Sequence, residues 1–136
     1  MTNDKPIILM AHGVWHPPNL YDPFKHALEA LGYELLVPEL ATMGSGKSGK
    51  IWDVDVAMLL ENATPLFNQG KSVVLVGHSY GGIPACIATR RNTIYERQVA
   101  GKRGGFCHLV FLAAFAMPAR YMSVQSVSGG SWLPWY

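Results

Sequence analysis

The stretch "SVVLVGHSYGG", residues 72–82, combines a strand, a tight turn and a serine. Val73–Val76 is a run of β-branched and apolar residues, which is typical of a strand buried on both faces. The run stops at Gly77, Ser79 follows two residues later, and helix-compatible sequence resumes just past it. This pattern predicts a serine displayed at a strand-to-helix turn. A serine hydroxyl is a poor nucleophile until a base takes its proton, so its role depends on the rest of the chain.

Residues Gly77-His78-Ser79-Tyr80-Gly81 match G-x-S-x-G, a motif whose setting is a strand that runs directly into a helix. Its two glycines leave room in a tight turn where a Cβ would clash with neighbouring backbone. The helix that follows adds free N–H groups and the positive end of its dipole beside the hydroxyl. The motif therefore makes Ser79 the candidate nucleophile. The alternative is a glycine-rich turn that carries an idle serine.

Apolar runs and helical patterns alternate along the chain. The runs are continuous rather than alternating, as in parallel strands that helices cover on both faces. We expect strands at 6–13, 33–40, 72–79 and 107–115, with helices at 22–32, at 52–68 and from just past Ser79 to about residue 91. The sequence thus predicts the α/β class, a three-layer sandwich around a four-stranded parallel sheet, in a single domain over residues 1–136.

The first two expected helices have apolar faces. Asp22 is predicted to cap the first, with Pro23 at its first helical position and Gly32 as its stop. In the second, Pro65 is expected to kink or end the helix, because proline lacks an N–H. The apolar positions that share one face are Phe24, Ala27, Leu28 and Leu31 in the first helix and Val56, Leu59, Leu60 and Ala63 in the second.

Composition excludes several classes of function. Eleven Lys and Arg against nine Asp and Glu give a net charge of +2, which favours neither nucleic-acid binding nor an acidic tail. Cys86 and Cys107 lie in apolar sequence without metal-ligand or disulfide spacing, so we interpret both as small buried hydrophobes. The N-terminal apolar run is too short for a signal peptide, and no stretch approaches the ~18 apolar residues of a membrane span. We expect a cytoplasmic protein with no membrane span, metal site or nucleic-acid partner.

Two segments rich in glycine and serine need separate interpretation. Residues 40–50 contain "GSGKS", but a phosphate-binding P-loop needs a glycine where Ala41 stands and a strand that leads straight into the loop. A solvated loop is therefore favoured over nucleotide binding. Residues 123–136, "SVQSVSGGSWLPWY", end in an aromatic cluster that is unusual for a free tail. We expect this segment to lead toward a cap or C-terminal half that this chain lacks.

A second functional feature follows the first expected strand. His12 and Gly13 close that strand, and a proline-containing loop comes next. If the first and third strands are neighbours, both following loops emerge at the carboxyl edge, where open α/β sheets bind ligands. The N–H groups of Val14 and Tyr80 would then form an oxyanion hole for an acyl-transfer intermediate.

Four segments resemble the α/β-hydrolase superfamily, in particular the N-terminal part of its small esterase and hydroxynitrile-lyase-like branch. They are "HGVWH" (12–16), "GYELLVPEL" (32–40), "VVLVGHSYGGIPA" (73–85) and "HLVFLAAFAMP" (108–118). The resemblance implies a partial α/β-hydrolase fold and a Ser-His-Asp hydrolase that acts on a small ester or acyl substrate without a cofactor. A serine at the motif, in place of aspartate, disfavours the epoxide-hydrolase and haloalkane-dehalogenase branches.

The same resemblance implies roles for individual residues. Ser79 matches the nucleophile, and Val14 and Tyr80 match the oxyanion positions. His12 with Gly13 matches the pair that braces the oxyanion loop by hydrogen bonding. Gly77 and Gly81 match the supporting glycines of the motif.

The sequence downstream of Ser79 offers no good candidate for the acid or the base of the catalytic triad. In this family the nucleophile comes first along the chain, then the acid, then the histidine. Downstream of Ser79 the sequence holds one carboxylate, Glu96, and one histidine, His108. Glu96 precedes the fourth strand and is expected at the amino edge of the sheet. His108 begins that strand, roughly 13 Å or more from Ser79 at about 3.3 Å per residue. We therefore expect the acid and base to lie outside this chain, which is then a fragment or truncated gene product, or a chain whose missing half arrives in trans.

The upstream histidines offer one makeshift base. His12 and His16 are both expected near Ser79, and a dyad with either is an alternative to the bracing role. His78 is expected to point away from the serine, and His26 is expected on a helix surface.

The favoured function is a serine hydrolase of the carboxylic-ester type that is inactive or weak as this chain alone. Two alternatives remain: a non-catalytic binding module or pseudoenzyme on the same scaffold, and a lyase of the hydroxynitrile-lyase type. A sheet that stops at the fourth strand exposes an apolar edge, which suggests self-association through that edge.

Overall fold

The computed structural model describes residues 5–43 and 52–117. Within them, a single sheet of four strands has the order β2-β1-β3-β4, and every pairing is parallel. The strands are β1 (Ile7–Ala11), β2 (Leu35–Leu36), β3 (Ser72–His78) and β4 (Gly105–Leu112). Continuous apolar runs therefore form a parallel sheet, and the predicted α/β class is confirmed.

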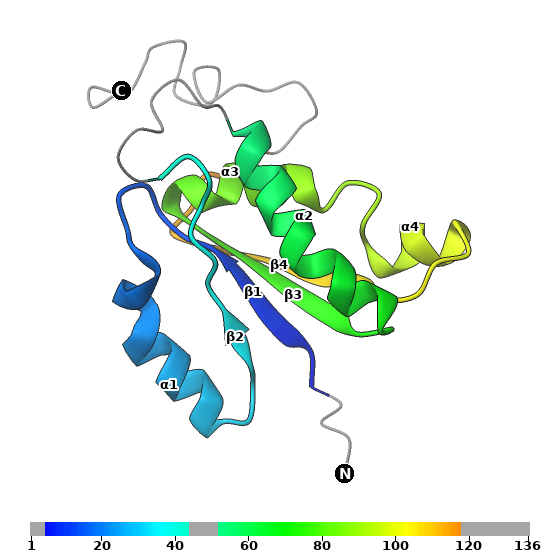
Figure 1. Ribbon diagram of the computed structural model, residues 1–136, viewed down its shortest axis with the longest axis horizontal. Coiled ribbons are helices and arrows are strands. Elements are labelled where there is room, and N and C mark those ends of the chain that lie inside the picture. The colour runs from blue at the N-terminus through cyan, green and yellow to red at the C-terminus, as the bar shows by residue number, and fades with distance from the viewer. Residues whose placement is uncertain (1–4, 44–51, 118–136) are drawn as a thin grey trace.

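Helices lie on both faces of this sheet (Figure 1). On one face lies α1 (Asp22–Ala30), which follows the short helix η1 (Pro18–Tyr21). On the other face lie α2 (Asp53–Asn68) and α3 (Gly82–Ala88), while α4 (Ile94–Val99) leads into β4. The short helix η2 (Ser79–Gly81) joins β3 to α3. The three layers predicted from the sequence are thus present.

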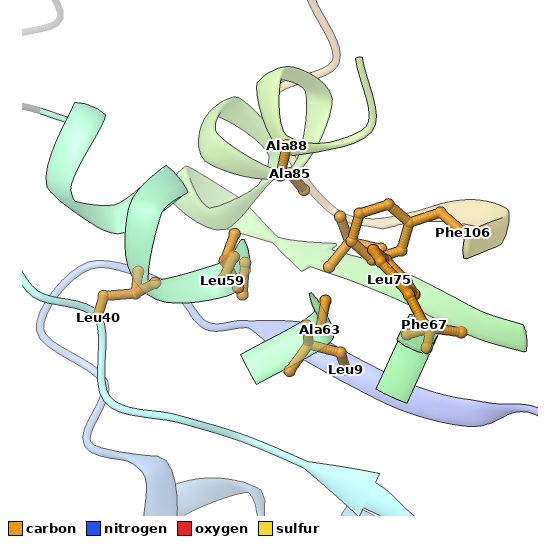
Figure 2. Close-up of a cluster of buried hydrophobic side chains, with 11 residues drawn as sticks. Leu9, Leu40, Leu59, Ala63, Phe67, Leu75, Ala85, Ala88 and Phe106 are labelled. Atoms are coloured by element: carbon orange, nitrogen blue, oxygen red, sulfur yellow. The ribbon is translucent and has the colours of Figure 1, made fainter. Parts of the chain in front are cut away.

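The larger core lies between the sheet and helices α2 and α3, as Figure 2 shows. Phe67 of α2 is fully buried, and its ring meets that of Phe106 edge-on, with 4.9 Å between the centroids. The guanidinium of Arg97 lies 4.7 Å from the Phe67 ring centroid and donates to backbone carbonyls of Arg103 and Gly104. Phe67 therefore joins α2, β4 and α4 in one contact.

The opposite face of the sheet is covered only in part. Leu28 of α1 packs with buried residues of β1 and β2, but Phe24 and Leu31 of the same helix remain 39% and 64% exposed. On β4, Val110 and Leu112 are 44% and 46% exposed. The apolar face of α1 is therefore only partly buried against the sheet.

The second strand and the third helix are among the elements that are shorter than expected. The second strand pairs only at Leu35–Leu36, because Pro38 has no N–H to donate to a ladder. The third helix ends at Ala88 instead of near residue 91, and the segment between this helix and β4 contains α4. Thr93 and Glu96 form a capping box at the start of α4, a T-x-x-E signal that the sequence analysis missed.

Several smaller details of the structure differ from the predictions. Helix α1 begins at Asp22 itself, with Tyr21 as its N-cap. Pro65 does not end α2, which continues to Asn68; Pro65 is exposed, so water can satisfy the carbonyl group that it leaves without a helical donor. Cys86 and Cys107 are free, as expected, but only half-buried. The "GSGKS" sequence and the aromatic segment 123–136 lie outside the described residues.

Replacement of Phe67 by alanine tests the packing of the larger core. We expect F67A to lower the free energy of unfolding by about 3–5 kcal/mol, because it leaves a cavity between α2, β4 and Arg97. The matched control F24A, at a partly exposed helical position, should cost less than about 1 kcal/mol. Urea denaturation monitored by circular dichroism measures both. Equal losses in the two variants would contradict the assigned core.

Candidate active site

Ser79 occupies a strained turn between β3 and α3. Its φ of +52° lies in the left-handed region, which few non-glycine residues adopt and which costs about 1–3 kcal/mol. A Cβ on Gly77 would lie 2.6 Å from the Cα of Gly82, and a Cβ on Gly81 would overlap the carbonyl oxygen of Ala11. Both motif glycines are therefore required by close backbone approach, and the surrounding backbone holds the serine in this conformation.

The loops that follow β1 and β3 lie against each other. Ala11 is paired with Gly77, so the two strands end at the same level. Gly81 packs against the end of β1, and a Cβ on Gly13 would lie 3.3 Å from Nδ1 of His78. The segments that carry Val14 and Tyr80 are thus brought together beside Ser79, as the sequence predicts for two neighbouring parallel strands.

The loop after β1 is itself strained. A hydrogen bond from the N–H of His16 to the carbonyl of Gly13, 3.2 Å long, closes a turn over Val14 and Trp15. Trp15 has a φ of +59°, and its N–H donates to Sδ of Met43. Strain of this kind in a bulky residue persists only where neighbouring contacts fix the backbone. The turn therefore presents Val14 in a fixed conformation.

His12 is fully buried, and both of its ring nitrogens are engaged. Nε2 accepts a hydrogen bond of 2.9 Å from the N–H of Leu40, so Nδ1 carries the proton and donates to the carbonyl of Gly13 at 2.8 Å. Burial lowers the pKa of His12, which keeps the imidazole neutral. His12 thus ties the loop after β1 to the segment after β2, and it has no ring nitrogen left to accept a proton from Ser79.

Tyr21 connects the remaining histidines to this loop. Its oxygen accepts a hydrogen bond of 2.9 Å from the N–H of Gly13 and lies 2.7 Å from Nδ1 of His78 and 3.2 Å from Nδ1 of His16. The two imidazole rings stack with 5.5 Å between centroids. Burial, followed by His16 and His12, lowers the pKa of His78, and burial raises the pKa of Tyr21. Tyr21 has no role predicted from the sequence, because its partners lie as far as 57 residues away.

The downstream candidates for acid and base lie far from Ser79. Glu96 is exposed on α4, where it accepts a hydrogen bond of 2.7 Å from the hydroxyl of Thr93. His108 is exposed on β4 and is paired with Val74, five residues before Ser79. At about 3.3 Å per residue, this places His108 about 16 Å from the serine. Within residues 5–43 and 52–117, no side chain hydrogen-bonds to the Ser79 hydroxyl.

Asp55 is a second buried polar residue that the sequence analysis missed. It lies in the first turn of α2, is fully buried, and accepts hydrogen bonds from Thr42 and from the hydroxyl of Tyr80. An acidic residue in a first helical turn is common for local electrostatic reasons, so its position alone carried no signal. Its contacts place it directly behind the serine turn.

The described part of the chain contains no group of three or more His, Cys, Asp or Glu side chains arranged to hold a metal ion. None of its helices is both long enough and apolar enough to cross a bilayer.

Comparison with known proteins identifies the scaffold. The family model described as "Alpha/beta hydrolase family" matches residues 8–136, nearly the whole chain. The chain belongs to the alpha/beta hydrolase family. This alpha/beta hydrolase also resembles a solved structure, an extracellular alpha/beta-hydrolase from a Paenibacillus species, with a TM-score of 0.63 and 23% identity. That match covers 83% of this chain and 42% of the Paenibacillus chain and shows the shared fold.

Curated relatives of this alpha/beta hydrolase include two from different kingdoms. It is 28% identical to the alpha/beta hydrolase nvfD of Aspergillus novofumigatus, in a match that covers 84% of this chain and 45% of that protein. It is also 28% identical to methylesterase 4 of Arabidopsis thaliana, over 96% of this chain and 50% of the relative. The chain thus spans about half the length of these relatives.

Replacement of Gly81 by alanine tests the contact between the two loops. We expect G81A to lower the free energy of unfolding by about 3 kcal/mol or more, because the added methyl overlaps the Ala11 carbonyl and pushes β1 from the turn. In the control G101A, the methyl meets nothing within 4 Å, so only the positive φ of +70° costs stability, about 1–2 kcal/mol. Thermal unfolding of the two variants provides the comparison, and a smaller loss in G81A would refute the close approach.

The buried state of His12 predicts a pH dependence of stability. Because its folded pKa lies below the ordinary value of about 6.5, the unfolded chain binds more protons as the pH falls below that value. The contribution of His12 to the free energy of unfolding should therefore be complete above about pH 6.5 and decrease as the pH falls toward the folded pKa.

Urea unfolding between pH 7 and pH 5 measures this slope, which the variant H12Q should flatten. Nitrogen NMR should show His12 protonated at Nδ1 only. Protonation at Nε2 near neutral pH would contradict the hydrogen bond from Leu40.

Proposed function

We propose that this alpha/beta hydrolase is the acyl-binding and nucleophile-bearing part of a serine hydrolase of the carboxylic-ester type. The observation that carries the proposal is the strained Ser79, held at φ +52° by glycine contacts at the carboxyl edge of the sheet. Backbone strain of this kind concentrates at functional sites, and the G-x-S-x-G turn is where such hydrolases display their nucleophile. Relatives described as methylesterases support an ester as the substrate class.

In the proposed reaction, the oxygen of Ser79 bonds to the acyl carbon of a small ester while the carbonyl electron pair moves onto its oxygen. The N–H groups of Val14 and Tyr80 would stabilise that oxyanion. The serine proton passes to a base and then to the alcohol that leaves, and water later releases the acid from the acyl-enzyme. No cofactor is needed for these steps.

The base is the part that the described residues do not supply. His12 has both nitrogens engaged, His16 and His78 are turned toward Tyr21, and His108 is distant. We therefore propose that this chain alone hydrolyses esters weakly or not at all.

A small-molecule ester is the proposed partner. A cytoplasmic location stays a prediction, since the Paenibacillus neighbour is described as extracellular.

A binding module on the hydrolase scaffold is the second candidate function. The observation that favours it is the state of the histidines, because those nearest the turn are engaged in buried hydrogen bonds instead of contacting Ser79. Such a module would bind an acyl compound at the same place without forming a covalent bond to the serine.

The variant S79C separates these functions without needing the base. A thiol of ordinary pKa, about 8.5, forms thiolate at pH 8 by itself and attacks esters directly. With p-nitrophenyl acetate, we expect S79C to release about one equivalent of p-nitrophenol in a burst at least tenfold faster than S79A, with one acetyl group added by mass. Cys86 and Cys107 are present in both variants and provide the background rate.

A burst in S79C no faster than the S79A background would overturn the hydrolase proposal and favour the binding module. The wild-type chain, assayed for steady turnover, should remain near the rate of S79A. Rapid wild-type turnover that S79A abolishes would instead show that a residue of this chain acts as the base.

A further inference from the structure

The carboxylate of Asp55 is a buried group that the proposed reaction leaves without a role. It is fully buried in the first turn of α2, beneath the serine turn. Burial of a carboxylate costs several kcal/mol unless hydrogen-bond donors replace water. Asp55 therefore binds its hydrogen-bond donors tightly and restrains their positions.

Three donors surround this carboxylate. Oδ1 accepts from the N–H of Thr42 at 2.8 Å, and Oδ2 accepts from the hydroxyl of Thr42 at 2.7 Å. Oδ2 also accepts from the hydroxyl of Tyr80 at 2.8 Å. The first two bonds hold the segment after β2 against α2. The third connects α2 to the residue that directly follows Ser79.

The Tyr80 bond acts on the turn directly beside the strained Ser79. The carbonyl of Ser79 accepts a hydrogen bond of 3.1 Å from the N–H of Phe115, and Gly81 is wedged against β1. The peptide between Ser79 and Tyr80 lies between these two fixed points, beside a strained φ. A hydrogen bond to a charged acceptor is roughly twice as strong as one between neutral groups, so it can hold the Tyr80 ring firmly.

We propose that Asp55 is a positioning residue for the oxyanion hole. Through the hydroxyl of Tyr80 it fixes the backbone of Tyr80, so that the Tyr80 N–H points at the place where the oxyanion develops. The inference rests on the proposed function, because it needs Tyr80 to be an oxyanion donor. Loss of one such donor typically lowers acyl transfer about 10²–10³-fold, so a misaligned one should lower it by about tenfold or more.

Two chemical probes of S79C distinguish positioning from simple structural support. Acylation by p-nitrophenyl acetate passes through an oxyanion, whereas alkylation by iodoacetamide does not, although both need an accessible thiolate. Y80F in the S79C background removes one hydroxyl donor to Oδ2. T42V removes the other hydroxyl donor to the same oxygen and leaves the Tyr80 bond in place, so it is the matched control.

We expect S79C/Y80F to lose about tenfold in acylation rate while its alkylation rate stays within about twofold of S79C. S79C/T42V should keep both rates within about twofold. S79C/D55N removes the charge from the acceptor of the Tyr80 hydroxyl, which weakens that contact from the other side, and should lower acylation in the same direction as Y80F, so it decides the matter if Y80F does not fold. Circular dichroism checks the folding of each variant.

Each other outcome contradicts one of the two proposals. Fast acylation of S79C that Y80F and D55N leave unchanged would overturn the positioning role alone. Parallel losses of acylation and alkylation, or equal losses in Y80F and T42V, would also overturn it, since they indicate structural support only. Acylation of S79C no faster than the S79A background, with normal alkylation, would overturn the proposed hydrolase and the positioning role with it.

Discussion

The pairing of Ala11 with Gly77 is the constraint on which the candidate site depends. Because β1 and β3 end at the same level, the loop after β1 and the turn after β3 emerge together at one edge of the sheet. Gly81 then packs so closely on the end of β1 that no side chain fits between them. A shift of this register by two residues would move one loop about 7 Å along the sheet, and Val14 would no longer lie beside Ser79.

Buried polar side chains secure the loops that this register brings together. Neutral His12 spans from the carbonyl of Gly13 to the N–H of Leu40, and Tyr21 accepts from the N–H of Gly13. On the other side of the serine turn, the carboxylate of Asp55 accepts hydrogen bonds from Thr42 and Tyr80. No buried side-chain nitrogen or oxygen in the described residues lacks a hydrogen-bond partner. The loops are therefore held by hydrogen bonds whose loss would leave buried groups unpaired, which costs about 1–3 kcal/mol each.

Sequence alone predicted the features that depend on neighbouring residues. The apolar run before Gly77 and the G-x-S-x-G spacing are local, and they gave the parallel sheet and the position of the serine turn correctly. The extent of the second strand depended on Pro38, and α4 on a capping pair that was overlooked. Only part of the apolar face of α1 is buried, because an apolar periodicity shows which face a helix can bury, not whether another element covers it.

The anchors of the site could not be predicted for a different reason. Asp55 and Tyr80 are 25 residues apart, and Tyr21 and His78 are 57 apart, so each contact exists only after the sheet has formed. Local sequence gives an aspartate in a first helical turn an ordinary electrostatic role, which hides its function. To predict such contacts, the register between β1 and β3 must be known in addition to the local sequence.

Under the proposed function, the described residues supply stabilisation of the oxyanion but not activation of the serine hydroxyl. The strained serine and the two oxyanion donors are fixed by backbone packing and buried hydrogen bonds, none of which involves a proton acceptor for Ser79. Electrostatic stabilisation of the oxyanion is therefore preorganised in the described residues before any base is in place. Activation of the hydroxyl is a separate requirement, because a neutral serine does not attack an ester at a useful rate without a base. A thiolate at the same position bypasses that requirement, so the oxyanion hole of this scaffold can be measured independently of the acid and base.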